Sequence, residues 1–289
     1  MPNPFLALKS RYFVFGVFFV SSVVIGLLYT LLLLVPNLAW FQDDPIKDPI
    51  TFILIFSSLC SILWLRGRRV GLQPRNLFGA LLPRFSIIYL LLLVVSGWLF
   101  SYGSFLVVFY PVSLIAPQFV TSLLLEELLK VETMLPNFYH GLMIFVTVIY
   151  APLTEEFIFR GILLQRWSVK WGLRAGIVLS SVLFGALHVN NPVGLTMFGL
   201  IMALLYVRSR SLWLPILAHS LNNLLSVLPE LLSTGAESTS LSLADFQQTW
   251  WIGLIFLGLS APVLGHFIYR SWPSLQNTPP YFANLHHHL

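Results

Sequence analysis

Long apolar runs without a single charge are the feature that most limits how this chain can fold. The first of them, FVFGVFFVSSVVIGLLYTLLLLV, occupies Phe13–Val35. A run of this length can cross a hydrocarbon core about 30 Å thick as a helix. The whole chain is 57% hydrophobic and 9% charged, whereas soluble domains hold about 25% charged residues. The sequence therefore predicts an all-α, polytopic membrane helix bundle.

The apolar pattern divides into eight predicted transmembrane segments. They are Phe13–Val35, Ile50–Leu65, Phe85–Tyr110, His140–Phe159, Ala175–Val189, Pro192–Val207, Leu212–Leu228 and Trp250–Tyr269. The shorter stretch FVTSLLLEELLKVE, with Glu126 and Glu127 on its polar face, is amphipathic and is expected to lie along the membrane interface.

Basic residues gather in every second connection between these segments. Arg66–Arg69 follow the second segment and Arg208 and Arg210 follow the sixth, whereas the connection QDDPIKD after the first segment is acidic. The positive-inside rule then places both termini in the cytoplasm. An odd number of segments would break this alternation, so eight is the predicted number.

Three regions follow from this pattern. Residues 1–135 hold the first three predicted transmembrane helices and the interfacial segment. Residues 136–230 hold four segments joined by short connections, which predicts one compact helical core. Residues 231–289 hold the last transmembrane helix and a tail ending in HHHL, which takes no part in the site argument.

Composition also argues against two other classes of protein. The formal net charge of +5 and the pI near 9.5 invite a nucleic-acid interpretation, but the basic residues lie in short scattered clusters rather than in one stripe. Cys60 is the single cysteine, so no disulfide can form within the chain.

Ionisable side chains inside predicted transmembrane segments are the strongest functional signal. Each costs at least about 2.5–3.5 kcal/mol to insert at the bilayer centre, so each is a candidate functional residue. Glu155, Glu156, His188 and His219, together with the polar Asn223, meet this description.

These polar residues also agree in depth. At 1.5 Å per residue, Glu155, His188, His219 and Asn223 lie about 13–21 Å along their helices from the nearest basic residue that is predicted to be cytoplasmic. All four thus fall within about 8 Å of one level, near the middle of a bilayer about 30 Å thick. One shared site explains this agreement.

Helical spacing separates the roles of the two glutamates. Glu156 and Arg160 are four residues apart and can pair along one helix face. Glu155 is rotated about 100° from Glu156 and can face a cavity. We therefore expect a buried, orienting ion pair beside one free carboxylate.

The same four-residue spacing links two further pairs. Phe184 shares a helix face with His188 and is expected to pack beside it. His219 and Asn223 share a face and can present two hydrogen-bond donors to one point.

A carboxylate, an imidazole and a donor pair are the parts of a hydrolytic site. Glu155 can take a proton from a water, and His188 can hold that water and later protonate the leaving amine. His219 and Asn223 can stabilise the oxyanion of a tetrahedral intermediate. Since no Ser or Cys occupies a nucleophile position, direct attack by activated water is the simpler scheme.

The motifs EEFIFR, FGALH and HSLNN occur here in the order, and at similar intervals, in which they occur in the CPBP family, the CAAX proteases and bacteriocin-processing proteins also called Abi. The resemblance covers about Tyr139 to Leu228. It implies a glutamate-dependent intramembrane endopeptidase with an active site open to the cytoplasmic side, in a bacterial plasma membrane or a comparable internal membrane. The roles that it implies agree with those above: Glu155 as base, His188 as its partner, Glu156 with Arg160 as the structural pair, and His219 with Asn223 as the oxyanion site.

The family includes proteins linked to prenylated C-termini, bacteriocin immunity and protein anchoring, so the resemblance does not transfer a substrate. The expected partners are a membrane-associated protein or peptide substrate and the lipid bilayer, without nucleic acid. No cofactor is expected.

Three alternatives stay open at this stage. Zinc could be held by Glu155, Glu156, His188 and His219, although Arg160 competes for Glu156 and the sequence lacks an HExxH pair. Chains of intramembrane Glu and His are equally typical of transporters and proton relays. A membrane scaffold without catalytic activity is the third alternative.

Overall fold

The computed structural model describes residues 3–8, 10–35, 41, 44–81, 83–125, 131–232 and 241–286. Every regular element in these ranges is a helix. The part of the chain that the structure describes is therefore an all-α protein, as the apolar runs predict.

Each of the eight predicted segments corresponds to a helix. The helices are α2 (Ser10–Leu34), α4 (Lys47–Arg69), α6 (Ile87–Ile115), the continuous run from α8 to α10 (Pro136–Trp171), α11 (Leu173–Ala186), α12 (Pro192–Ser209), α13 (Trp213–Leu232) and α15 (Ile252–Ser271). Most boundaries lie within a few residues of those predicted. The fourth helix differs, because it continues past Phe159 to Trp171.

Six of these helices, in the described residues, are long and apolar enough to cross a membrane. The other two are α11, which is shorter, and α13. The chain is therefore an integral, multi-pass membrane protein, and the number of eight crossings stays a prediction.

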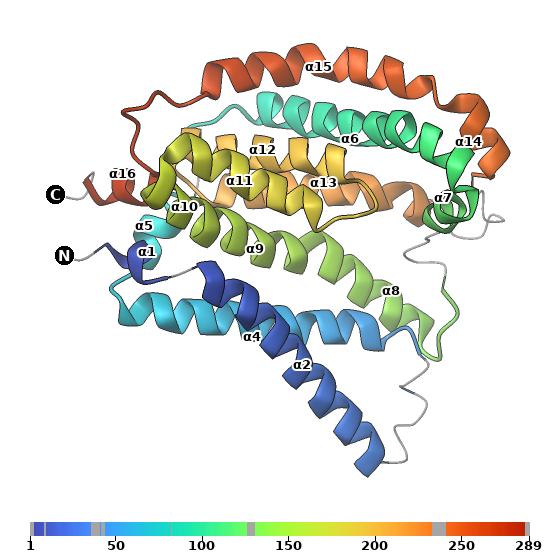
Figure 1. Cartoon of the computed structure of the whole chain (residues 1–289), viewed down its shortest axis with the longest axis horizontal. Coiled ribbons are helices and arrows are strands. Elements are labelled where there is room, and N and C mark those ends of the chain that lie inside the picture. The colour runs from blue at the N-terminus through green and yellow to red at the C-terminus, as the bar shows by residue number, and fades with distance from the viewer. Residues whose placement is uncertain are drawn as a thin grey trace.

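The helices form layers around a central group (Figure 1). The run from α8 to α10 and the helices α11, α12 and α13 lie in the middle. Helices α6 and α15 pack together on one side, and α4 lies on the other side with α2 crossing it obliquely. The central group corresponds to the region 136–230 in which the polar residues lie, so the packing on both sides shields them from lipid.

The predicted basic connections meet at one end of the bundle, which we call the basic end. It carries Arg66, Arg68, Arg69, Arg166, Lys170, Arg208 and Arg270. The first and last described helices, α1 (Pro4–Ala7) and α16 (Pro280–His286), lie at this same end (Figure 1). This arrangement agrees with the predicted alternation of basic connections, while the cytoplasmic location of the basic end stays a prediction.

Short helices close the basic end. Phe5 of α1 is fully buried and lies edge-on against Tyr281 of α16, with ring centroids 5.1 Å apart. Helix α5 (Pro74–Phe78) joins this group, because the Tyr281 hydroxyl accepts a hydrogen bond from the Gln73 N–H. Tyr206 of α12, also fully buried, donates to the Leu77 carbonyl. The bundle is therefore packed, not hollow, at this end.

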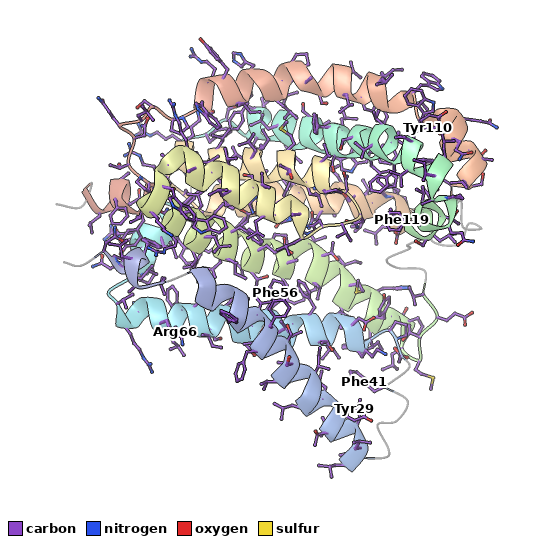
Figure 2. The ribbon with its side chains drawn as sticks, in the orientation of Figure 1. Tyr29, Phe41, Phe56, Arg66, Tyr110 and Phe119 are labelled. Atoms are coloured by element: carbon purple, nitrogen blue, oxygen red, sulfur yellow. The ribbon has the colours of Figure 1, made fainter. Side chains whose placement is uncertain are left out.

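Large apolar side chains cover the outer surface. On α2, Tyr29 points away from the bundle and is 59% exposed (Figure 2). Phe18 and Phe19 of the same helix are also exposed. So much exposed apolar surface is unfavourable in water and is what lipid contact requires.

Two sequence predictions concern residues that are not fully described. The amphipathic stretch begins with α7 (Pro117–Leu124), but Glu126 and Glu127 lie outside the described residues. The last three residues of the HHHL tail also lie outside them.

Candidate active site

The helix that carries the two glutamates is wound irregularly around them. Helix α9 (Ala151–Glu156) lies between two π-helical segments, η2 (Val146–Tyr150) and η3 (Phe157–Leu164). Pro152 has no N–H to donate to the preceding turn, which accounts for a break in the regular α-helical ladder here. Wide turns of this kind are frequent at functional sites.

Glu156 is the centre of a buried polar cluster. Its Oε1 lies 2.9 Å from Nη1 of Arg160 and 2.8 Å from Nδ1 of His219. Glu156 and Arg160 are both 0% exposed and His219 is 4% exposed. The ion pair suggested by the four-residue spacing is thus present, and His219 joins it from α13.

Arg160 links three helices. Its Nη2 donates to the Gly199 carbonyl of α12 at 3.1 Å. Its guanidinium carbon lies 4.8 Å from the ring centroid of Phe184 on α11, a cation–π arrangement. This one side chain therefore fixes η3 against α11 and α12.

Glu155 has a different environment from Glu156. Its Oε2 lies 3.9 Å from Nε2 of His219, too far for a direct hydrogen bond, and its side chain is 12% exposed. Within the described residues its carboxylate makes no hydrogen bond. Glu155 is therefore the carboxylate of the pair that can accept a proton from an added molecule.

Both histidines hold their Nδ1 atoms against groups that only accept hydrogen bonds. Nδ1 of His219 faces the Glu156 carboxylate, and Nδ1 of His188 lies 2.7 Å from the Phe184 carbonyl oxygen. We therefore assign the proton of each neutral ring to Nδ1. Nε2 of each ring is then free to accept a hydrogen bond, and it becomes a donor when the ring takes up a second proton.

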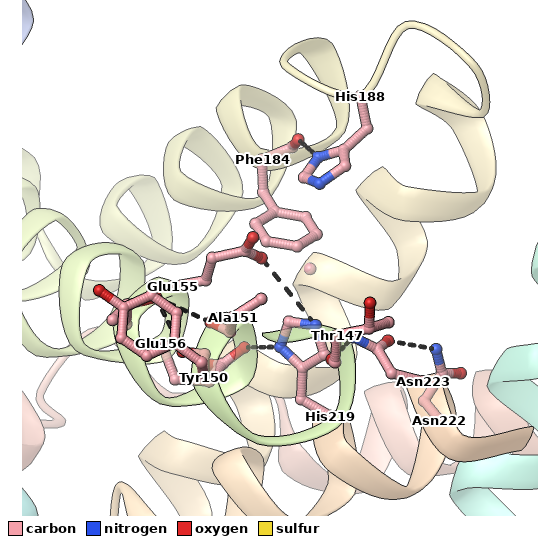
Figure 3. Close-up of polar contacts among 12 residues, drawn as sticks. Thr147, Tyr150, Ala151, Glu155, Glu156, Phe184, His188, His219, Asn222 and Asn223 are labelled. Carbon is pink, nitrogen blue, oxygen red and sulfur yellow. Dashed lines mark hydrogen bonds and ion pairs between the residues drawn. The ribbon is translucent and has the colours of Figure 1, made fainter. Parts of the chain in front are cut away.

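His188 and Asn223 lie beside this cluster at different places, His188 next to Phe184 and Asn223 next to Thr147 (Figure 3). His188 lies beside Phe184, with ring centroids 4.6 Å apart. The side-chain amide of Asn223 donates to the Thr147 carbonyl at 2.9 Å. Asn223 thus has one of its two N–H groups engaged and the other available, and the expectation that His219 and Asn223 donate to one point stays a prediction.

Some residues at the site carry no signal in the sequence. Phe198 lies edge-on to His219 with ring centroids 4.8 Å apart, and Gly199 contributes only its carbonyl. Thr147 likewise acts through its backbone. Only the interhelical packing shows these contacts, because a backbone carbonyl can belong to any residue type.

Metal binding at this site would need at least three of these side chains to converge on one ion. Among the described residues, no group of three or more His, Cys, Asp and Glu side chains is placed to hold a metal ion. Arg160 and His219 already occupy Oε1 of Glu156. The zinc alternative stays open to experiment.

The fold and the site together define a polytopic helical membrane protein with a buried glutamate–histidine cluster at its centre. Residues 136–225 match the family described as "Type II CAAX prenyl endopeptidase Rce1-like". Over this segment the chain resembles the CPBP family, in agreement with its three motifs.

One curated relative supports the same assignment. A Bacillus subtilis (strain 168) protein named "Putative membrane peptidase YdiL" is 36% identical over 92 residues. The match spans 31% of this chain and 38% of that relative. No solved structure matches the chain significantly.

Proposed function

We propose that this protein is an intramembrane endopeptidase that hydrolyses a peptide bond with water activated by Glu155. The observation that carries the proposal is that the two glutamates have different partners. Glu156 is bound by Arg160 and His219, whereas Glu155 faces Nε2 of His219 at 3.9 Å with its oxygens free. The family match and the name of the relative support a peptidase in general.

In the first step a water lies between Glu155 and His188. The Glu155 carboxylate accepts one proton of this water, while Nε2 of His188 accepts a hydrogen bond from the other O–H and orients it. The oxygen attacks the carbonyl carbon of the scissile peptide bond. A tetrahedral intermediate with one negatively charged oxygen results.

His219 is suited to stabilise that oxygen when its ring carries both protons. Glu156 accepts from Nδ1 and balances the charge of the imidazolium, so Nε2–H can donate to the oxyanion. Before the attack, the carboxylates of Glu155 and Glu156 balance Arg160 and this imidazolium. Once Glu155 has taken up its proton, the oxyanion carries that negative charge, so the cluster keeps no net charge. The second N–H of Asn223 is the other available donor. Removing one such donor typically lowers the rate by about 10²–10³-fold.

The intermediate collapses when its C–N bond breaks. The proton taken up by Glu155 passes through Nε2 of His188 to the leaving nitrogen. The products are a carboxyl group and an amine, and one water is consumed. Glu155 returns to its carboxylate form.

Replacing Glu155 with Gln tests this proposal. The amide cannot act as the base. Because general-base catalysis raises the rate by about 10²–10⁴-fold, we expect the cleavage rate to fall by about that factor or more. Mass spectrometry of membrane-protein termini in cells with wild-type protein or Glu155→Gln measures the loss and identifies the substrate. Glu132→Gln, on the exposed surface, is the matched control and should cleave as the wild type does.

Four results would separate this proposal from its alternatives. Unchanged cleavage in Glu155→Gln would remove Glu155 as the base. Loss of cleavage on treatment of purified protein with a chelator, and its recovery with Zn²⁺, would favour the metal-dependent version. Full activity after chelation would eliminate that version. If no termini change but Glu155→Gln blocks proton movement across vesicles, a proton relay is favoured.

The same proposal includes the substrate, the membrane, and the side of the membrane to which the active site opens. We expect a membrane-associated protein or peptide as substrate, and a bacterial plasma membrane or a comparable internal membrane as location. The family resemblance implies an active site open to the cytoplasmic side. Because the basic end is packed, such an opening would run sideways between helices. Labelling of Asn190→Cys, in a Cys60→Ser background, from each side of the membrane tests it.

A further inference from the structure

A cavity of about 510 Å³ lies next to the catalytic cluster, between α6, α13 and the start of α12. Its lining includes Asn222 and Asn223, so it borders the site directly. Along α13, Asn223, Ser226 and Pro229 follow His219 by about 6, 10 and 15 Å. Since α13 starts at Trp213, just after Arg210 of the basic end, the cavity extends away from that end.

The space between the catalytic cluster and the basic end is filled by buried side chains. Between Glu156 and the basic end, the residues of η3 are all buried, among them Leu163 and Leu164 at 1% and 0% exposure. Gln165 donates to the Tyr206 hydroxyl in the same fully buried layer. A chain held at Glu155 can therefore extend toward the cavity but not along the bundle axis toward the basic end.

The cavity carries no charge, and its mostly apolar lining is interrupted by a few polar side chains. Its polar side chains include three amides, Asn191, Asn222 and Asn223, and two serines, Ser101 and Ser226. Trp98, Tyr102 and Phe105 supply an aromatic wall. A charged guest would lose its hydration here without gaining a counter-charge. The lining suits a neutral group that makes hydrogen bonds.

Asn222 shows which kind of hydrogen bond is missing. It is 8% exposed, and its Oδ1 is buried without a partner in the described structure. Its Nδ2 faces Oδ1 of Asn223 at 3.4 Å. Buried acceptors are almost always paired, so this oxygen lacks a donor. Because it has almost no accessible surface, the Asn222 side chain must turn toward the cavity before its oxygen can receive an N–H. A peptide backbone offers that donor together with a neutral surface.

We propose that this cavity is the subsite that binds the peptide segment of the substrate next to the scissile bond, with a backbone N–H of that segment donating to Oδ1 of Asn222. The inference rests on the proposed function, because it takes the substrate to be a peptide. It adds the location of the bound segment, in the half of the bundle away from the basic end, and the preference for an uncharged segment.

The first test probes the cavity without relying on proteolysis. In a Cys60→Ser background, Ser226→Cys places one thiol on the cavity wall, and mass spectrometry follows its labelling by N-ethylmaleimide. Acetyl-Ala-Ala-Ala-amide at millimolar concentration should slow labelling severalfold, and the free acid acetyl-Ala-Ala-Ala should slow it less. Ser274→Cys, exposed near the basic end, should be unaffected. The proposal would be overturned if Ser226→Cys is not labelled, or if the two peptides slow its labelling equally or not at all.

The second test uses the substrate found with Glu155→Gln. Ser226→Phe fills the cavity and should raise KM at least tenfold while kcat changes little, whereas Ser274→Phe, on the exposed surface near the basic end, should stay within twofold of wild type. If Glu155→Gln abolishes cleavage but Ser226→Phe leaves KM unchanged, the subsite is wrong and the proposed function stands. If the wild type cleaves nothing, the proposed function fails, and the labelling experiment still decides whether the cavity binds a neutral peptide.

Discussion

Arg160 shows how a charge is accommodated inside this bundle. Its side chain is fully buried, and it meets the Glu156 carboxylate, the Gly199 carbonyl and the face of Phe184. Neutralisation by Glu156 removes most of the penalty that a lone guanidinium would bring. The same contacts orient Glu156 toward His219, so a stabilising pair also serves the arrangement of the site.

Arg160→Met should lower the free energy of unfolding by about 3–5 kcal/mol, because it leaves the Glu156 charge buried without its main partner. Equilibrium unfolding in detergent micelles measures the loss. The double variant Glu156→Gln with Arg160→Met removes both charges and should recover part of it. A double variant that is less stable than Arg160→Met alone would contradict this explanation.

At the scale of elements, small residues let α11 and α12 approach closely. A Cβ on Gly185 would lie 2.5 Å from the Pro192 carbonyl and would clash with Thr196. A Cβ on Gly199 would lie 3.1 Å from Cα of Ser181. Close backbone contact at glycines is a common way of packing helices in membranes. It brings Phe184 and His188 to the level of the glutamates.

Gly185→Ala should therefore push α11 away from α12, lower stability by about 1–3 kcal/mol as overpacking does, and reduce cleavage. Thermal unfolding and the cleavage assay measure the two effects. Gly265→Ala in α15, where a Cβ meets nothing within 4 Å, is the control and should be neutral or stabilising by up to about 1 kcal/mol. Equal effects in both variants would contradict the role of Gly185 in the close approach of α11 and α12.

A second link between elements joins the chain before α4 to the chain before α8. The carboxylate of Asp44 accepts hydrogen bonds from the N–H groups of Ile46 and Met134 and from the Thr133 hydroxyl. Burial alone would raise the pKa of Asp44, but these hydrogen bonds outweigh it and hold the pKa below its usual value. The link therefore stabilises the protein most when Asp44 is charged.

Because the folded pKa is lowered, the stabilisation by Asp44 is complete above the unfolded pKa of about 3.9 and is lost as pH falls through the folded value. Asp44→Asn should be less stable than wild type at neutral pH, and the difference should shrink below about pH 4. Thermal unfolding as a function of pH measures both. Thr133→Val keeps the carboxylate and its two N–H donors, so it should retain part of the pH dependence. A constant difference across this range would contradict the link.

At the scale of the whole molecule, charge is distributed unevenly between the two ends of the bundle. The ends of α4, α10, α12 and α15 bring their basic residues together at the basic end, with α1 and α16 beside them (Figure 1). The positive-inside rule predicts that this end faces the cytoplasm. The number of crossings and the positions of both termini depend on that orientation.

Thiol labelling in spheroplasts tests the orientation. In a Cys60→Ser background, Ala244→Cys, exposed in α14 (Leu243–Thr249) at the other end, should react with a membrane-impermeant maleimide added outside. Ser274→Cys, near the basic end, should react only after permeabilisation. The reverse pattern would place the basic end outside, and labelling of both from outside would contradict the predicted crossings.

Hydrophobicity and residue spacing along the chain predict the helical class, the order and approximate bounds of the long apolar helices, and the residues that are candidates for the site. These properties are local, because hydrophobicity and i, i+4 spacing are read along one segment. The extension of the fourth helix to Trp171 was missed, since its last turns carry charges that a hydropathy pattern assigns to a connection.

Which polar groups meet depends on how the helices pack in the folded protein. His219 binds Glu156, Asn223 turns to Thr147, and the Gly199 carbonyl completes the contacts of Arg160. These contacts depend on the rotation and depth of each helix relative to its neighbours. Spacing within one helix cannot specify that relation, because it is set by packing between segments that are distant in the sequence.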